Sequence, residues 1–293
     1  MTTTAHVVHP WGRKPAASIR MNRGHWAHRG LVGLWDFREG AGATSYVTWP
    51  KSVPTIALDT ATWTVHTKIG VGLSTLAANT DDVTISNDTS YNFDKANPHS
   101  LLLWGAAVAT ERFTAQKMSI PVGPAVQGWQ IGIETTGKAS YMLRGAGGGS
   151  ERIFVQSDTT TWGDGNPHML VTTYDGSVTA AGVKIYGDGA LLAVTVSTDA
   201  LVNATTHTDP IRIQKTSSTQ YYTGQTYRLA IWNRVLTYGE VVQLYAMPWS
   251  VYQPKRSMTA LHAEVTAAQI WPALSASQFV VPYIGRETMS SMD

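Results

Sequence analysis

Cysteine is absent from the 293-residue sequence. Without it the chain can form no disulfide, no thiolate metal site and no thiol nucleophile. A large hydrophobic core does not need disulfides as staples, so this absence fits a protein that assembles in a reducing cytoplasm.

Charge is also scarce, since charged residues make up 14% of the chain against about 25% in ordinary soluble domains. Thr, Ser and Gly fill the deficit, and this mixture favours strands joined by many turns over a helical bundle. The charges are unevenly placed, because the first 30 residues hold five basic side chains and no acid, whereas the net charge of the chain is only +2. The five basic residues are Arg13, Lys14, Arg20, Arg23 and Arg29.

Long apolar runs are missing as well. The N-terminus has no apolar segment of signal-peptide length, and no stretch approaches the roughly 18 apolar residues of a membrane span. We therefore expect no membrane partner. If the protein is found outside a cell, we expect it to be released by lysis or as part of a particle.

Three parts are predicted along the chain. Residues 1–29 form an extended basic N-terminal arm without a sustained apolar period, residues 30–247 form one domain, and residues 248–293 form a tail. A free tail would expose aromatic surface that soluble monomers usually avoid. We therefore expect the tail to pack against its own domain or a neighbouring subunit. Its aromatic residues include Trp271, Phe279 and Tyr283.

The middle part contains short runs rich in Val, Ile, Thr, Tyr and Trp, with Gly, Asp, Asn or Pro at their ends, which predict β-strands. Gly187-Asp188-Gly189 predicts a tight hairpin turn, because these residues tolerate positive φ. Thr237 and Glu240 form a capping-box pattern that predicts a helix of about two turns, ended by Pro248. The predicted strands are 30–37, 82–86, 101–109, 129–134, 141–144, 153–156, 168–174, 183–186, 190–196, 211–214 and 227–232.

The joint order of these blocks resembles the laminin-G-like, concanavalin A-like family across residues 30–247. The opening Gly30-Leu-Val-Gly-Leu-Trp-Asp-Phe37 is similar to the family's first strand. Residues 167–177 with the following hairpin are similar to its central pair, and residues 224–245 to its closing strand and helix. The resemblance implies an all-β, antiparallel two-sheet jelly-roll sandwich with one short helix and extended N- and C-terminal arms.

The end of the domain carries a narrower resemblance. Residues 244–254, which read Leu-Tyr-Ala-Met-Pro-Trp-Ser-Val-Tyr-Gln-Pro, are similar to a variant of the family that is frequent in bacteriophage virion proteins. In that variant the helix runs into a Pro-Trp turn.

Some proteins of this fold cleave glycans, and retaining glycosidases need two carboxylates about 5–5.5 Å apart on one strand face. No Glu-x-Asp-x-x-Glu run exists in the sequence. Asp36 and Glu39 are three residues apart, so they lie on opposite faces if the strand continues, and Glu39 belongs to a turn. We interpret both as structural and expect no enzymatic activity.

Two groups of residues offer metal-ligating atoms. His25 and His28 suit a shared metal only if the arm is helical, and without a nearby acid or Cys they are more simply polar linker residues. A loop-like group of acids and amides offers oxygen ligands for calcium, but its spacing matches no calcium-loop pattern, which favours solvated turns. We therefore expect no cofactor, with calcium as the alternative. The acids and amides are Asp81, Asp82, Asn87, Asp88, Asn92 and Asp94.

Exposed Trp and Tyr side chains stack on sugar rings in lectins and anchor protein interfaces. Trp129, Trp162, Tyr221 and Tyr222 fall near predicted strand ends or loops, so they are candidates for a glycan-binding rim. For each one alone, core or interface packing is the simpler explanation. The residues that fall inside strand patterns, and are therefore expected in the core, are Trp35, Trp104 and Trp232.

A functional hypothesis follows from three features: the long terminal segments, the absence of a signal-peptide segment, and the resemblance of residues 244–254 to bacteriophage virion proteins. We expect a non-enzymatic structural virion protein of a tailed bacteriophage, assembled in the host cytoplasm, with a capsid decoration or cement protein ahead of a tail component. Its arms would bind capsid or other virion proteins and sister subunits of a homo-oligomer. Nucleic acid is not expected, because five charges without interleaved aromatics are a weak signal. The alternative is a carbohydrate-binding adhesin or fibre component that recognises host-surface glycans.

Overall fold

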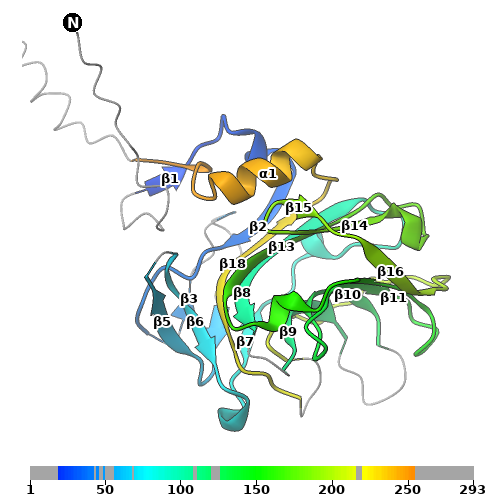
Figure 1. Cartoon of the computed structure of the whole chain (residues 1–293), viewed down its shortest axis with the longest axis horizontal. Helices are drawn as coiled ribbons and strands as arrows, with labels where there is room; N and C mark the ends of the chain where they lie inside the picture. Colours follow the sequence, from blue (N-terminus) through cyan, green and yellow to red (C-terminus); the bar gives the residue numbers. More distant parts are fainter. Residues whose placement is uncertain are drawn as a thin grey trace, which may run out of the picture. The chain divides into compact units, whose positions relative to one another are not determined.

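The computed structural model describes residues 19–42, 44–45, 49, 56–67, 69–107, 111–119, 126–215 and 220–254. These residues form two antiparallel β-sheets stacked face to face, which confirms the expected jelly-roll sandwich (Figure 1). All of the described residues except Pro254 belong to one compact unit, which ends at Gln253. No helix within the described ranges is long and apolar enough to cross a membrane.

We call the two layers sheet I and sheet II. Sheet I follows the order β15 (Ala190–Leu191), β14 (Val183–Gly187), β13 (Pro167–Tyr174), β8 (His99–Ala107), β18 (Gly224–Trp232), β6 (Gly70–Thr75) and β5 (Thr62–His66), and β2 (Leu31–Trp35) pairs with β18. Sheet II follows the order β16 (Val194–Asp199), β12 (Arg152–Ser157), β11 (Ala139–Arg144), β10 (Gly128–Ile133), β9 (Phe113–Met118), β17 (Ile211–Ile213), β7 (Val83–Ile85), β4 (Ile56–Leu58) and β3 (Thr44–Ser45). Short 3₁₀ turns join them: η1 (Trp26–His28), η2 (Ala77–Asn79), η3 (Thr89–Tyr91), η4 (Thr161–Gly163) and η5 (Ala180–Gly182).

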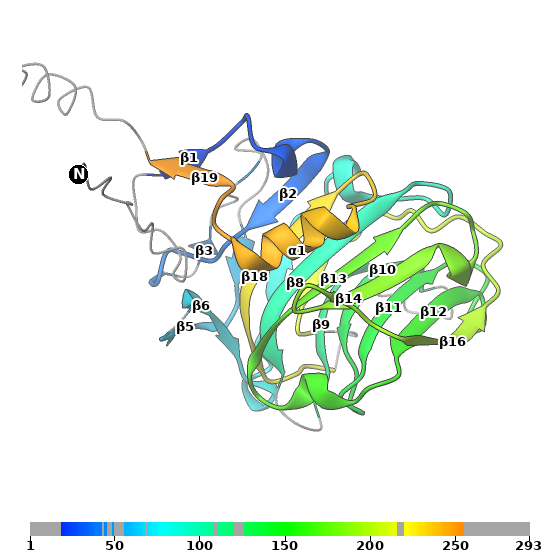
Figure 2. The same cartoon turned by 45° about the horizontal axis from the view of Figure 1, so that its top comes forward.

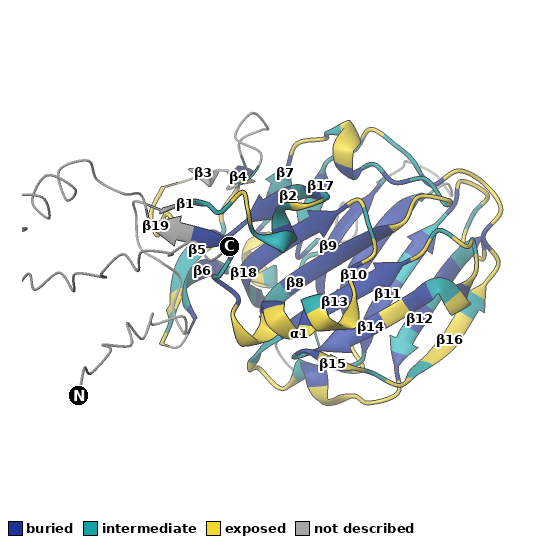
Figure 3. Cartoon of the chain, turned by 90° about the horizontal axis from the view of Figure 1, so that it is seen from above, coloured by how far each residue is buried: buried dark blue, intermediate teal, exposed yellow. Residues whose placement is uncertain are grey.

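The main core lies between the sheets and follows from strand alternation. Leu101 and Leu103 of β8 face it from sheet I, and Ile131 of β10 and Val155 of β12 face it from sheet II. Figure 3 shows the resulting band of buried residues along the central strands, with exposed residues along the edge strand β16. Each predicted segment contains strand residues, but the predicted strand 190–196 is corrected: it divides at residues 192–193 into β15 of sheet I and β16 of sheet II.

The predicted turn and helix are confirmed in detail. Asp188 and Gly189 both adopt positive φ, 49° and 84°, as the hairpin between β14 and β15 requires. Helix α1 (Tyr238–Ala246) begins with the capping box, in which the Thr237 Oγ1 accepts from the Glu240 N–H at 3.3 Å and the Glu240 carboxylate accepts from the Thr237 N–H at 2.8 Å. The helix lies over the outer face of sheet I (Figures 1 and 2).

The predicted domain boundaries at residues 29 and 247 need correction. Residues 26–28 form η1, Ala27 is buried, and its carbonyl accepts from the Trp232 indole N–H at 2.8 Å. After the helix, Trp249 and Val251 are buried in the same apolar layer over sheet I. Strands β1 (Ile19–Met21) and β19 (Tyr252–Pro254) then pair with each other (Figure 2). Apolar residues on both sides of the predicted boundaries therefore pack on the sandwich and extend it.

Other predicted arm and tail residues lie outside the described residues: Arg13, Lys14, Trp271, Phe279 and Tyr283. The backbone of Arg20 belongs to β1, and the structure describes nothing of its side chain.

A buried ion pair fixes the layer above sheet I. The Arg228 Nε of β18 donates to Asp36 Oδ1 at 2.5 Å, and Nη2 donates to Oδ2 at 3.3 Å. Asp36 is 0% exposed and Arg228 is 2% exposed. The Arg228 Nη1 donates to the Pro248 carbonyl, and the guanidinium lies 4.2 Å from the ring centroid of Trp249. One arginine therefore joins the segment after β2 to the turn after α1.

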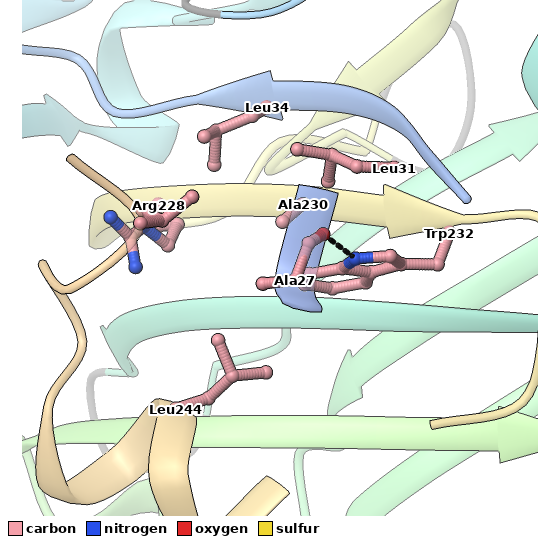
Figure 4. Close-up of a pocket in the computed structure, with 8 residues that line it drawn as sticks. Ala27, Leu31, Leu34, Arg228, Ala230, Trp232 and Leu244 are labelled. Atoms are coloured by element: carbon pink, nitrogen blue, oxygen red, sulfur yellow. Dashed lines mark hydrogen bonds between the residues drawn. The ribbon is translucent and has the colours of Figure 1, made fainter. Parts of the chain in front are cut away.

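Figure 4 shows the apolar surroundings of this arginine, with Leu34, Ala230 and Leu244 around a small cavity. The cavity has a volume of about 10 Å³, which is the size of one water molecule and too small for a ligand.

We predict that Asp36→Ala lowers the free energy of unfolding by about 3–5 kcal/mol, because it leaves the Arg228 charge buried without its partner. The double variant Asp36→Leu with Arg228→Met should recover most of that loss, since it removes both charges. Urea denaturation of the wild type, the single variant and the double variant measures this. A double variant that is no more stable than Asp36→Ala would contradict the pairing.

Candidate functional site

An open groove of about 740 Å³ lies on the outer face of sheet I. Five segments that are distant in sequence line it: the turn between β5 and β6, strand β8, the start of β13 with Asn166, the β14–β15 turn, and the end of α1 with Pro248. Its lining residues are His66, Thr67, Ile69, Trp104, Asn166, Pro167, Asp188, Tyr245, Ala246 and Pro248.

The aromatic part of the groove is held in place by the buried arginine. Trp104 of β8 is partly exposed, and its ring stacks on Trp249 with centroids 5.6 Å apart and planes inclined by 14°. Trp249 is itself held against the Arg228 guanidinium. The ion pair between Asp36 and Arg228 therefore determines where the Trp104 ring meets solvent.

Tyr245 adds a second aromatic ring from the last turn of α1. Its side chain is 45% exposed and lies close to the β14–β15 turn, because a Cβ built on Gly189 would come within 3.1 Å of the Tyr245 Cβ. Gly189 is therefore required both for its positive φ and for this close approach.

One wall of the groove is fixed by His168, which bridges two carboxylates. Its Nδ1 lies 2.7 Å from Asp188 Oδ2 and its Nε2 lies 3.0 Å from Asp164 Oδ1. A neutral imidazole carries one N–H, so both contacts are satisfied only by the protonated ring. In agreement, the hydrogen bond to Asp188 raises the pKa of His168 against the effect of partial burial, with smaller contributions from Asp164.

The same network orders the turn before β13. Asp164 accepts from the Asn166 N–H and from the Asn166 Nδ2, both at 2.8 Å. The Asn166 bonds outweigh desolvation and, with His168, lower the pKa of Asp164. The Asp188 Oδ1 also accepts from the Met169 N–H at 2.9 Å. Backbone and carboxylates thus hold Asn166 and Asp188 at the groove.

The groove combines two chemical characters. Trp104 and Tyr245 offer flat apolar surfaces, and Asn166, Asp188 and His66 offer hydrogen-bonding groups beside them. Such a site can hold a small polyhydroxylated ligand, because aromatic rings contact its C–H faces while the polar groups bind its hydroxyls.

The predicted rim residues do not come together at this groove. The expectation that Trp129 lies on an exposed rim is wrong, because this side chain is 1% exposed. Its indole N–H donates to the Tyr91 carbonyl at 3.1 Å inside the core. Its side chain points from β10 into the core. The sequence showed that Trp129 lies near a strand end, but not which face of the sheet its ring occupies. Trp162 is buried behind the groove wall, edge-on to His168 with centroids 5.0 Å apart.

Tyr221 and Tyr222 lie elsewhere, next to β17. The Lys215 Nζ is 4.6 Å from the ring centroid of Tyr221, and the Tyr222 N–H donates to the Gln214 carbonyl at 3.0 Å. Both side chains are half-buried. Of the residues expected in the core, Trp35 and Trp232 are buried, whereas Trp104 is the groove residue that sequence reasoning misplaced.

The structure separates the two acids that were weighed as a catalytic pair. Asp36 is buried and bonded to Arg228, so its carboxylate is not accessible to a substrate. Glu39 is exposed in the segment that follows β2.

Most members of the loop group considered for calcium accept hydrogen bonds within the fold. Asp81 accepts from the Leu76 N–H at 2.7 Å and from Thr60, and Asp82 pairs with Lys215 at 2.8 Å. Asn87 is exposed. No group of three or more His, Asp or Glu is placed to hold a metal ion within the described part of the chain. The remaining bonds are Asp88 from Ser90 N–H, Asn92 from His207 N–H and Asp94 from Thr205 N–H.

The described residues of the basic arm have local roles. His25 accepts from the Ala27 N–H at 3.2 Å and thereby caps η1, and His28 lies edge-on to Trp49 with centroids 4.4 Å apart. Arg23 stacks over the same Trp49 ring at 5.6 Å, and the Arg29 carbonyl accepts from the Arg234 Nε at 2.7 Å.

The family model described as the concanavalin A-like lectin/glucanases superfamily matches residues 77–242. The chain belongs to this superfamily. This match confirms the resemblance drawn from the strand blocks. The superfamily name covers both lectins and glucanases, so membership leaves open whether a member binds or cleaves. No curated protein matches the chain.

Solved structures share the sandwich at low sequence identity. The binding domain of Paraclostridial mosquitocidal protein 1 has a TM-score of 0.57 at 12% identity, covering 74% of this chain and 52% of that chain. Trypanosoma rangeli sialidase in complex with sialic acid has a TM-score of 0.52 at 14% identity, covering 76% and 33%. The receptor binding domain of botulinum neurotoxin C/D mosaic serotype has 0.52 at 11%, covering 74% and 51%.

At these identities the likeness shows the fold alone. The chain matches about half of the two toxin domains and a third of the sialidase.

We predict that His168→Gln destabilises the protein more near pH 6 than near pH 9. The folded-state pKa of His168 is raised above an unfolded value of about 6.5, so its stabilisation is complete below that value and is lost as the pH rises through the folded-state pKa. Urea denaturation of both proteins at the two pH values measures this difference. An equal loss of stability at both would show that the ring is not held as an imidazolium.

Proposed function

We propose that this member of the concanavalin A-like superfamily is a non-enzymatic binding module whose groove on sheet I holds a glycan. The observation that carries the proposal is the meeting of Trp104 and Tyr245 with Asn166 and Asp188 in one open groove. Aromatic surface beside a few placed polar groups is the usual composition of a site for a small polar ligand.

The polar groups of the groove favour binding over cleavage. Asp188 is the single carboxylate among the described lining residues, whereas canonical retaining and inverting glycosidases use two. Asp188 is also engaged by His168 and by the Met169 N–H. The similar structures give supporting analogy, since they include a binding domain, a receptor binding domain and a sialidase in complex with sialic acid.

A glycan array followed by titration of any positive sugar tests this function. We predict that Tyr245→Ala weakens sugar binding roughly tenfold, because it removes one stacking surface. Tyr238→Ala is the matched control, because Tyr238 is also an exposed tyrosine on α1, with 58% of its surface accessible. Its ring stacks on Tyr186 and does not line the groove.

Two outcomes would contradict the proposal. One is an array without any saturable signal for the wild type. The other is an equal loss of binding in the Tyr245 and Tyr238 variants, because that would place the sugar elsewhere or show only a general effect on the helix.

A second candidate function is attachment to a bacteriophage virion, as a capsid decoration protein or a tail component. The observation in its favour is the pairing of β1 with β19, in which the Asn22 N–H donates to the Val251 carbonyl at 2.8 Å. The chain therefore enters and leaves the sandwich at neighbouring strands. In this role, residues 1–18 and the residues after Pro254, both outside the described ranges, would bind shell proteins and sister subunits.

Deleting residues 1–18 tests attachment without removing η1 and its contacts. We predict that this variant binds purified particles much more weakly than the full chain in a co-sedimentation assay, while Tyr245→Ala binds them normally. Mass spectrometry of particles gives the location: a copy number near that of the shell protein supports decoration, and a few copies support the tail. Undiminished binding after the deletion, or absence from particles, would contradict this role.

A further inference from the structure

Two arginines occupy paired positions on neighbouring strands of sheet II, on the side that faces away from the core. Arg144 of β11 and Arg152 of β12 are directly opposite residues in the antiparallel register. Like charges in this position destabilise a strand pair. Their mutual repulsion therefore gives no electrostatic reason within the fold for keeping two arginines at this position.

No acid neutralises the pair within the described ion pairs of the chain. The Arg144 Nε donates to the Gly148 carbonyl at 3.4 Å, the Arg152 Nη1 lies 4.0 Å from the Met142 sulfur, and the Arg152 Nε is buried without a hydrogen-bond partner. Burial first, and then the charge of Arg152, lower the pKa of Arg144. The two side chains therefore interact unfavourably in the folded protein.

The nearest acid in sequence has another role. Glu151 accepts from the Val202 N–H at 3.0 Å and from the Asn203 Nδ2 at 2.8 Å. These bonds tie the β11–β12 turn to the segment after β16 and leave the arginine pair without a counter-charge.

The turn beside the pair is built from glycine, as Gly145-Ala-Gly-Gly-Gly149. A Cβ at Gly148, whose φ is 108°, would meet nothing within 4 Å, and a Cβ at Gly149 would lie 3.4 Å from the Arg144 Nη2. The turn therefore places no side-chain bulk at Gly148 and Gly149, beside the Arg144 guanidinium, whereas the Glu151 carboxylate fills the space at Gly145 and Gly147.

Polar and apolar groups continue from the pair across the sheet. Gln130, Met142 and Phe154 are successive partners on β10, β11 and β12. They alternate with the inward residues Ile131, Leu143 and Val155, so they share the outward face with the arginines. Gln130 is only 2% exposed and Arg152 covers the Phe154 ring, so an anionic group on the arginines would place the rest of its molecule beside the partly exposed Met142 side chain.

We propose that Arg144 and Arg152 bind the acidic group of a polysaccharide, a carboxylate or a sulfate on a sugar ring. The planar guanidinium forks match such oxyanions, and the bound charge relieves the repulsion between the two strands. This site lies on the opposite sheet from the groove and does not depend on the proposed function. Nucleic acid fits less well, because the Phe154 ring beside the pair is already covered by Arg152 at 5.1 Å, and phosphate-backbone binding relies on many cations.

Isothermal titration at about 0.15 M salt, with trigalacturonate and with a sulfated trisaccharide, tests the site and separates the two acidic groups. At least one should bind the wild type, and Arg152→Gln should bind it roughly tenfold to a hundredfold more weakly. Arg152→Lys, which keeps the charge and loses the fork, should fall between them. Arg38→Gln is the matched control, since it removes an equal charge from an arginine that also stacks on a ring, that of Tyr252, and it should bind normally.

Thermal unfolding separates a binding role from a structural one. Without ligand, Arg152→Gln should melt at or above the wild-type temperature, because the repulsion is removed. The ligand should raise the melting temperature of the wild type and not that of the variant.

Three results would overturn the proposal. The first is that neither acidic trisaccharide binds. The second is that Arg152→Gln binds the acidic trisaccharide as tightly as the wild type does. The third is that a short oligothymidylate binds through the same arginines at least as tightly.

Discussion

The buried ion pair between Asp36 and Arg228 is the constraint on which the outer layer of the protein depends. A desolvated guanidinium has to be satisfied on all sides, and here the segment after β2, the Pro248 carbonyl and the Trp249 ring do so together. The pair therefore fixes the turn after α1 on sheet I. A carboxylate that sequence reasoning weighed as catalytic is instead the anchor of this layer.

The groove follows from that anchor. Trp249 supports Trp104 from below, α1 presents Tyr245, and the bridged imidazolium of His168 holds the opposite wall. Each part is held by a charge or a ring that is itself fixed by the fold, so the site is formed before any ligand arrives, which limits the entropy lost on binding. The arginine pair on sheet II differs from the groove, because there the folded chain keeps two like charges at paired positions of neighbouring strands.

Sequence patterns were sufficient for the sandwich, because alternation, turn glycines and the Thr237–Glu240 capping box are local signals. β9 was missed because Phe113-Thr-Ala-Gln-Lys-Met118 carries polar residues at buried positions. The groove was not predictable, since Trp104 occupies an ordinary strand position and only the gap beside α1 exposes it. Trp129 and Trp162 were expected at an exposed rim and are buried. A position near a strand end does not reveal whether a ring points into the core.

A crystal structure of the double variant Asp36→Leu with Arg228→Met tests the central claim most directly. The account predicts an intact sandwich in which the Pro248–Trp249 turn has moved and the Trp249 ring no longer stacks on Trp104. A turn in its original place, with the two rings still stacked, would show that the ion pair does not position the groove.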